Sequence, residues 1–161
     1  MNFQADILAV QECVNALGHW RVNRDGLADL IVGARNSDPA AVADAGRTYV
    51  VFGQTGTTSI NLSALTASGN TLGFVINGQC DEDYSGSSVS SAGDVNGDGL
   101  ADVIVGAYLS GTSADAGRSY VVFGKTSGTG IDLSAVAAGI GGFVINGQSA
   151  SDYSGYSVAS A

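Results

Sequence analysis

Basic residues are scarce in this chain of 161 residues. It has 6 Lys and Arg against 15 Asp and Glu, so its formal net charge is −9. A field of this sign repels nucleic acid and anionic membrane surfaces. We therefore expect no nucleic-acid partner, and divalent cations are the more natural ligands.

Long apolar runs and cysteines are also scarce. No run approaches the about 18 residues that a membrane-spanning helix needs, and the start MNFQADILAV shows no basic region before its short apolar stretch. We expect neither membrane insertion nor a signal peptide here. Cys13 and Cys80 are too few for a disulfide framework, and Ser149 occupies the position that repeats Cys80, so we interpret both as incidental.

Glycine and small β-formers dominate what is present. The chain has 24 Gly and a single Pro, and it is 45% hydrophobic with only 13% charged residues. This composition is too apolar for a disordered chain and favours short strands joined by tight turns. We predict an all-β fold.

The chain repeats itself with a period of about 70 residues. The matching segments are GLADLIVGA (26–34) with GLADVIVGA (99–107), DAGRTYVVFG (44–53) with DAGRSYVVFG (115–124), and GFVINGQ at 73–79 and 142–148. The length differences between the copies fall in polar stretches, as expected of a structural repeat with variable loops.

Each unit contains four predicted strands. In the second unit they are the apolar runs 101–105, 120–123 and 143–145, preceded by the alternating stretch 87–92. Four short strands without a helical period predict β-propeller blades of four antiparallel strands, about two blades plus an extra strand. A solenoid of stacked sheets is the structural alternative.

The repeat divides the chain into four segments. They are an atypical segment (1–20), a first unit (21–82), a second unit (83–152) and the first strand of a third, incomplete blade (153–161). In segment 1–20, apolar residues recur at helical spacing, which indicates a short amphipathic helix or an accidental pattern. These residues are Phe3, Ile7, Val10, Val14 and Leu17.

An Asp-rich stretch in the second unit has the pattern of a calcium loop. This second loop (94–102) carries side-chain oxygens at positions 1, 3, 5 and 9, and we expect a backbone carbonyl ligand at position 7. The predicted ligands are Asp94, Asn96, Asp98, Leu100 and Asp102. A helix–loop–helix calcium hand is excluded, because its position 12 would be Val105 inside an apolar run. The alternative is a hydrated Asp-Gly turn.

The equivalent first loop (21–29) carries arginine at two positions, Arg21 and Arg24. The loop charge changes from −3 to 0. A divalent cation about 6 Å from one arginine loses on the order of 5 kcal/mol at an effective dielectric constant of about 20. We expect this site to be weak or lost. Its candidate ligands are Asn23, Asp25, Leu27 and Asp29.

The inventory of catalytic groups is poor. His19 is the single histidine, and no GxSxG or HExxH motif is present. Asp81, Glu82 and Asp83 form an acidic cluster, but the equivalent stretch of the second unit has only one acid, Asp152. This difference favours a solvated loop over paired catalytic acids. We predict that the chain is not an enzyme.

The tyrosines indicate an alternative function, carbohydrate binding, since exposed aromatic rings stack on sugars. The candidates are Tyr84, Tyr108, Tyr153 and Tyr156. Packing in the blade core is the competing interpretation.

The residues SGSSVSSAGDVNGDGLADVIVGA (85–107), followed by GRSYVVFG (117–124), resemble the FG-GAP repeats of integrin α-chain β-propellers and their bacterial relatives. Ser-Gly at Ser85 and Ser154 replaces the Phe-Gly of the family name, and Arg35 and Tyr108 replace the Pro of Gly-Ala-Pro. The resemblance implies a propeller of about seven blades with calcium on its loops, at the cell surface or outside the cell, in adhesion or ligand binding. A similar propeller accompanies the catalytic domain of glycosylphosphatidylinositol-specific phospholipase D, so an accessory propeller of a larger hydrolase is an alternative.

Two units cannot close a propeller, because each sheet needs neighbours on both faces. We therefore expect the chain to be part of a longer repeat array or a protomer of a homo-oligomeric ring, in which segment 153–161 completes the first blade of the next copy. The expected ligands are proteins or glycans.

Overall fold

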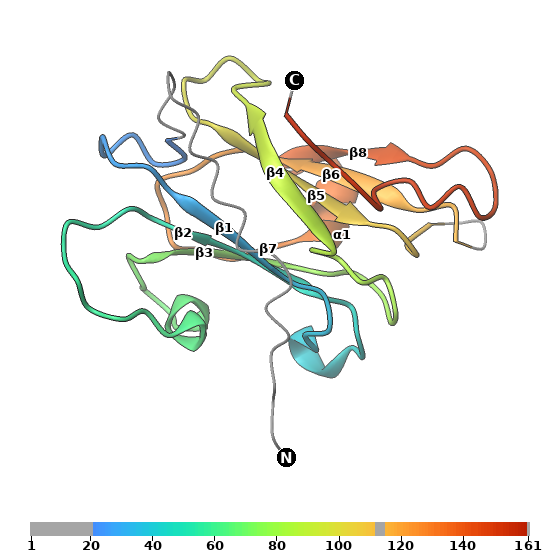
Figure 1. Cartoon of the computed structure of the whole chain (residues 1–161), viewed down its shortest axis with the longest axis horizontal. Helices are drawn as coiled ribbons and strands as arrows, with labels where there is room; N and C mark the ends of the chain where they lie inside the picture. Colours follow the sequence, from blue (N-terminus) through green and yellow to red (C-terminus); the bar gives the residue numbers. More distant parts are fainter. Residues whose placement is uncertain (1–20, 112–114, 161) are drawn as a thin grey trace.

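The computed structural model of the chain describes residues 21–111 and 115–160, which form two four-stranded β-sheets (Figure 1). The predicted N-terminal helix, Cys13 and His19 lie outside these residues. No helix in the described part of the chain is long and apolar enough to cross a bilayer. The elements, in chain order, are β1 (Leu30–Ala34), η1 (Pro39–Ala41), β2 (Arg47–Val51), η2 (Leu62–Thr66), β3 (Gly73–Asn77), β4 (Ser88–Gly93), β5 (Asp102–Ala107), β6 (Arg118–Val122), β7 (Ile131–Asp132), α1 (Leu133–Ala137) and β8 (Gly142–Asn146).

The second sheet is an antiparallel meander in the order β4-β5-β6-β8. Its four strands coincide with the four that the sequence predicts, within two residues at each end. Apolar and small residues alternate along these strands, so every second side chain faces the same way. The register aligns Val89, Val105, Tyr120 and Val144 across one face.

The first sheet combines strands from both units. Strands β1, β2 and β3 are antiparallel, and β7 of the second unit pairs in parallel with the outer edge of β3, placing Ile131 opposite Ile76. The sequence pattern did not predict β7 or the one-turn helix α1 that follows it. A strand of two residues is too short to show a period, and only its tertiary partner defines it.

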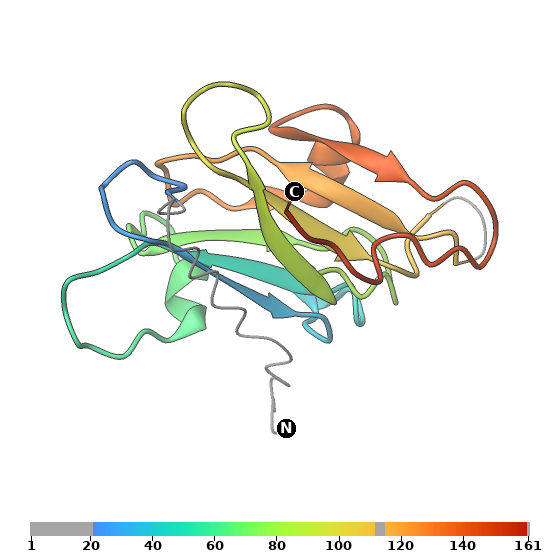
Figure 2. The same cartoon turned by 45° about the horizontal axis from the view of Figure 1, so that its top comes forward.

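The two sheets pack face to face as two layers (Figure 2). The core between them draws apolar side chains from both units, among them Ile31, Phe52, Phe74, Val105 and Tyr120. A smaller cluster around Tyr49, Val51 and Leu65 lies on the other face of the first sheet. The predicted all-β fold of propeller blades is confirmed.

The chain passes from one blade to the next over a glycine. A Cβ at Gly33 would collide with the carbonyl oxygen of Gly86 in the link to β4, and a Cβ at Gly106 would collide in the same way with the carbonyl oxygen of Gly155. Because these carbonyls lie directly against the sheets, no larger residue fits. Isolated parallel bridges, Gly46 with Ser85 and Gly117 with Ser154, form beside both crossings.

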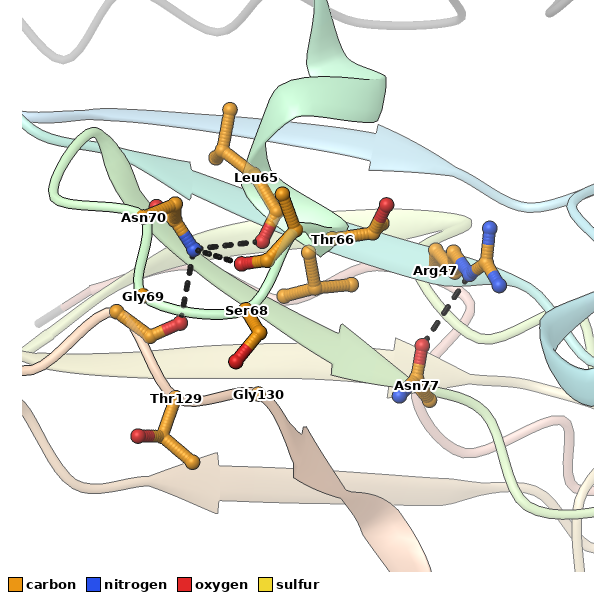
Figure 3. Close-up of a pocket in the computed structure, with 12 residues that line it drawn as sticks. Arg47, Leu65, Thr66, Ser68, Gly69, Asn70, Asn77, Thr129 and Gly130 are labelled. Atoms are coloured by element: carbon orange, nitrogen blue, oxygen red, sulfur yellow. Dashed lines mark hydrogen bonds between the residues drawn. The ribbon is translucent and has the colours of Figure 1, made fainter.

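Asn70 joins the two units at their outer edge (Figure 3). Its side-chain amide donates to the carbonyl oxygens of Leu65 at 2.8 Å and of Gly128 in the second unit at 3.0 Å. A polar cavity of 330 Å³ lies beside this joint, between the η2–β3 loop and residues 128–130, and Arg47 and Asn77 line its other end. The joint fixes the second unit against the first before β7 begins.

Candidate metal centre

The second loop lies between β4 and β5 and is exposed along most of its length. Gly97 and Gly99 adopt positive φ angles of 76° and 84°, which side chains with a Cβ rarely adopt. The alternation of glycine with Asp and Asn therefore permits a tight turn whose side chains fold back onto their own backbone.

Three exposed side chains of the second loop accept hydrogen bonds from its N–H groups. The Asp94 carboxylate accepts from Asp98 at 3.0 Å and from Gly99 at 2.8 Å. The Asn96 side-chain oxygen accepts from the same Asp98 N–H at 2.9 Å, and one oxygen of Asp98 accepts from Leu100 at 2.8 Å. Since Asp94 and Asn96 share one donor, their oxygens lie close together.

Asp102 has a different position, because it is 0% exposed at the start of β5. Its two oxygens accept the N–H of Val95 and the N–H of Gly124, each at 2.8 Å. The carboxylate thus clasps the loop to the chain that follows β6. Burial raises the pKa of Asp102, although these backbone bonds oppose the shift.

The first loop repeats this clasp. Asp29, which is buried, accepts the N–H of Val22 at 2.6 Å and that of Gly53 at 2.8 Å, and burial raises its pKa as well. Three turn bonds also recur. Leu27 donates to Asp25 at 2.7 Å, the N–H of Asp25 donates to Asn23 at 3.1 Å, and the Asn23 amide donates to Asp25 at 2.9 Å, as the Asn96 amide does to Asp98. The contacts of position 1 have no counterpart, because Arg21 stands there.

Arg24 of the first loop reaches the second loop. Its guanidinium donates to the carbonyl oxygen of Gly99 at 3.1 Å and to that of Asp98. The repeat places these residues 75 and 74 positions apart, so local sequence patterns carried no signal of the contact. A guanidinium of the first loop therefore lies against the backbone of the second loop.

The hydrogen bonds around the exposed Asp98 side chain favour its ionised form. The Leu100 N–H bond, with smaller contributions from Asn96 and Arg24, holds the pKa of Asp98 below its ordinary value. Within the described ranges no group of three or more His, Cys, Asp or Glu side chains is placed to hold an ion. A cation here would use the carboxylates of Asp94 and Asp98 with the amide oxygen of Asn96.

The oxygen donors of the second loop fit calcium by their chemistry, since calcium prefers carboxylate, amide and carbonyl oxygens. A carboxylate oxygen that accepts one N–H keeps a lone pair for a cation, so the turn bonds and ion binding are compatible. The Leu100 carbonyl remains a predicted ligand, and so does Asp102 beside its role as a clasp.

Residues 85–122 match the family model of the FG-GAP repeat. This stretch of the chain is similar to an FG-GAP repeat. The match takes in β4, the second loop, β5 and β6, and it confirms the resemblance for that stretch. FG-GAP repeats are non-catalytic modules. No curated protein matches the chain.

At the opposite end of β5, four tyrosines form a cluster. Tyr108 lies between three other rings, with centroid distances of 5.9 Å to Tyr84, 6.4 Å to Tyr153 and 5.5 Å to Tyr156. Tyr153 and Tyr156 are 42% and 71% exposed. A hollow of 550 Å³ opens between Tyr108, Tyr153, Tyr156 and Asp152. The cluster lies at the surface, not in the blade core.

The carboxylates of Asp81 and Asp83 both accept backbone hydrogen bonds, one from the β1–β2 connection and one from their own loop. Asp81 accepts the N–H of Ala43 at 3.2 Å, and Asp83 accepts that of Cys80 at 3.0 Å. Asp83 is only 6% exposed, and burial raises its pKa. Asp83 thus stabilises the turn that leads into the link between the units, and Asp81 ties that turn to the β1–β2 connection.

Proposed function

We propose that this chain is a non-enzymatic FG-GAP module that binds one calcium ion in the second loop and serves adhesion or ligand binding outside the cell. The observation that carries the proposal is the convergence of Asp94 and Asn96 oxygens on one exposed N–H, beside an Asp98 carboxylate with a lowered pKa. Bound calcium would neutralise these carboxylates and hold the turn between β4 and β5.

An extracellular setting agrees with this loop. Its side-chain donors Asp94, Asn96 and Asp98 are exposed, and Arg24 lies against the loop, so its affinity should be modest. Extracellular calcium modules bind with dissociation constants of about 10⁻⁴ to 10⁻³ M. The integrin-like role follows from the FG-GAP repeat and is part of the proposal. In that role the two sheets belong to a larger set of blades, in a longer array or in a ring of copies.

The test is a calcium titration of thermal stability. Binding to the native state stabilises it by about 2.7 kcal/mol when calcium is about 100 times its dissociation constant. We expect the unfolding midpoint of the wild type to rise with calcium and that of Asp98→Ala to rise much less.

Asp25→Ala in the first loop is the matched control. It removes the two turn bonds that the Asp25 carboxylate accepts, from the Asn23 amide and the Leu27 N–H, so it lowers the starting midpoint as Asp98→Ala does, yet its calcium response should equal that of the wild type. Equal calcium shifts in the wild type and Asp98→Ala would refute the site. A magnesium titration of the same three proteins tests the choice of ion.

A second candidate function rests on the tyrosine cluster. Two exposed rings beside a carboxylate at an open hollow form a surface on which a sugar ring can stack while its hydroxyls reach Asp152. We propose glycan binding at this end of β5. A glycan array probed with the wild type and with Tyr156→Ala is the test: signals lost in the variant support the proposal, and an array without signals dismisses it.

A further inference from the structure

Apolar side chains are exposed on one side of the second unit at positions where the first unit buries them. Val95, Phe143 and Ile145 are 50%, 39% and 47% exposed, whereas their counterparts Val22, Phe74 and Ile76 are 0% exposed. We call the three exposed residues, together with Ile104 and Phe123, the trailing face. Because the residue types are equal or alike, the difference lies in what covers them.

The second unit covers these apolar side chains of the first unit. Lys125 lies over the ring of Phe74 at 4.6 Å from its centroid, and Ile131 of β7 pairs with Ile76. The N–H of Ala101 donates to the carbonyl of Arg21 at 3.0 Å. The contacts of this internal interface therefore show what kind of surface packs on the equivalent side of a unit.

The first unit also exposes apolar side chains, on its other side. Leu30 is 43% exposed, although its counterpart Val103 is 0% exposed. Val32 and Leu62 are half-buried, and their counterparts Val105 and Leu133 are buried. We call Leu30, Val32, Ile60 and Leu62 the leading face. It is the counterpart of the surface with which the second unit covers the first.

We propose that the leading face of one copy of this chain docks on the trailing face of a second copy. The inference rests on the proposed role as a repeat module and identifies its partner. By analogy with β7, Ile60 and Asn61 extend the outer edge of β8 at Ile145 and Asn146. Gln54, the counterpart of Lys125, then lies over Phe143.

Backbone contacts of the internal interface have counterparts in this arrangement too. The Ala28 N–H would donate to the Asp94 carbonyl of the other copy, as Ala101 does to Arg21. Asn146 would donate to Asn61, as the Asn77 amide donates to Asp132 at 2.9 Å. A second copy thus supplies both the apolar and the polar partners of the trailing face.

Charge sets the conditions for docking. Both copies carry a formal net charge of −9, so their repulsion weakens association at low ionic strength. The contact itself buries apolar surface, which salt does not screen. Association should therefore strengthen as sodium chloride is added, whereas an interface held by ion pairs would weaken.

The experiment is sedimentation velocity on the full chain at micromolar concentrations. The wild type should form species of at least twice the monomer mass. Phe143→Lys on the trailing face and Leu30→Lys on the leading face should each weaken association by about tenfold or more. Each variant keeps one intact face, so an equimolar mixture should form a dimer and nothing larger. Formation of that dimer also shows that both variants are folded.

Ala150→Lys is the matched control, because its counterpart Asp81 stays exposed beside the docked second unit; it should associate like the wild type. A monomeric wild type at every salt concentration overturns the proposal. Association lost in Phe143→Lys but kept in Leu30→Lys also overturns it, since that result indicates a symmetric contact. Calcium should stabilise the monomeric variants as well, so the two proposals fail separately.

Discussion

The first and second loops, compared position by position, differ in charge far more than in shape. Both form the same turn bonds around Asp25 and Asp98, and both are clasped by a buried carboxylate, Asp29 or Asp102. The first loop has lost its position 1 carboxylate and still keeps the turn. Side chain to backbone hydrogen bonds therefore shape these loops, and we expect the difference in charge to decide which of them binds a cation.

The largest difference in stability is expected between substitutions on the covered face of the first sheet and on the exposed face of the second. Phe74→Ala should destabilise the chain by about 3 to 5 kcal/mol, because it leaves a cavity in the core. Phe143→Ala, at the exposed counterpart, should cost less than about 1 kcal/mol in the monomer. Urea denaturation of both variants at low protein concentration measures the difference. Equal losses would mean that the two sheets do not pack as described.

The next largest effect on stability is expected at the two buried carboxylates that hold the loops. Asp102→Ala and Asp29→Ala each leave two N–H groups without an acceptor, which should cost about 2 to 5 kcal/mol in either loop. If Asp102 also serves the ion, as predicted, only its variant loses the calcium response. Denaturation with and without calcium separates the two roles. A normal calcium response in Asp102→Ala would leave it as a clasp alone.

The double variant Arg21→Asp, Arg24→Gly converts the first loop to the sequence of the second. It removes two positive charges and restores the position 1 carboxylate, so calorimetry should show a doubled calcium stoichiometry. Arg24→Gln alone should tighten binding in the second loop, because it removes a cation from beside Asp98 and Gly99. An unchanged stoichiometry in the double variant would show that loop charge does not decide binding.

The smallest expected effect concerns pH. Burial raises the folded-state pKa of Asp83, an effect that the hydrogen bond from the Cys80 N–H, with smaller contributions from Ser110 and Arg118, only partly opposes. The contribution of this group to stability is therefore greatest below its ordinary pKa of about 3.9 and is lost as pH rises through the raised value. Asp83→Asn should match the wild type near pH 4 and exceed it at neutral pH.

The control for that measurement is Asp152→Asn in the second unit. Asp152 accepts the equivalent N–H, from Ser149 at 2.7 Å, but at an exposed position. The variant therefore reports the loss of a surface charge alone. Parallel pH profiles for the two variants would assign the effect to net charge and not to burial.

Sequence reasoning reached the four strands of the second unit and the Asp loop because both are local patterns. Alternating Val, Ile and Tyr indicate strands, and Asp, Asn and Gly at fixed offsets indicate a turn with converging oxygens. It missed β7, the clasp formed by Asp102 with Gly124, and the contact of Arg24 with Gly99. These contacts join residues that are far apart in the chain, so no local pattern reports them.

The sequence by itself determined the repeat, the all-β class and the contrast in charge between the two loops, because each depends on residue types at short spacing. Only the tertiary structure decided which copy of each face is covered. Phe74 and Phe143 occupy the same position in nearly the same sequence, yet one is 0% and the other 39% exposed. Burial is a property of the neighbour, and a repeat acquires its neighbours only when the units stack.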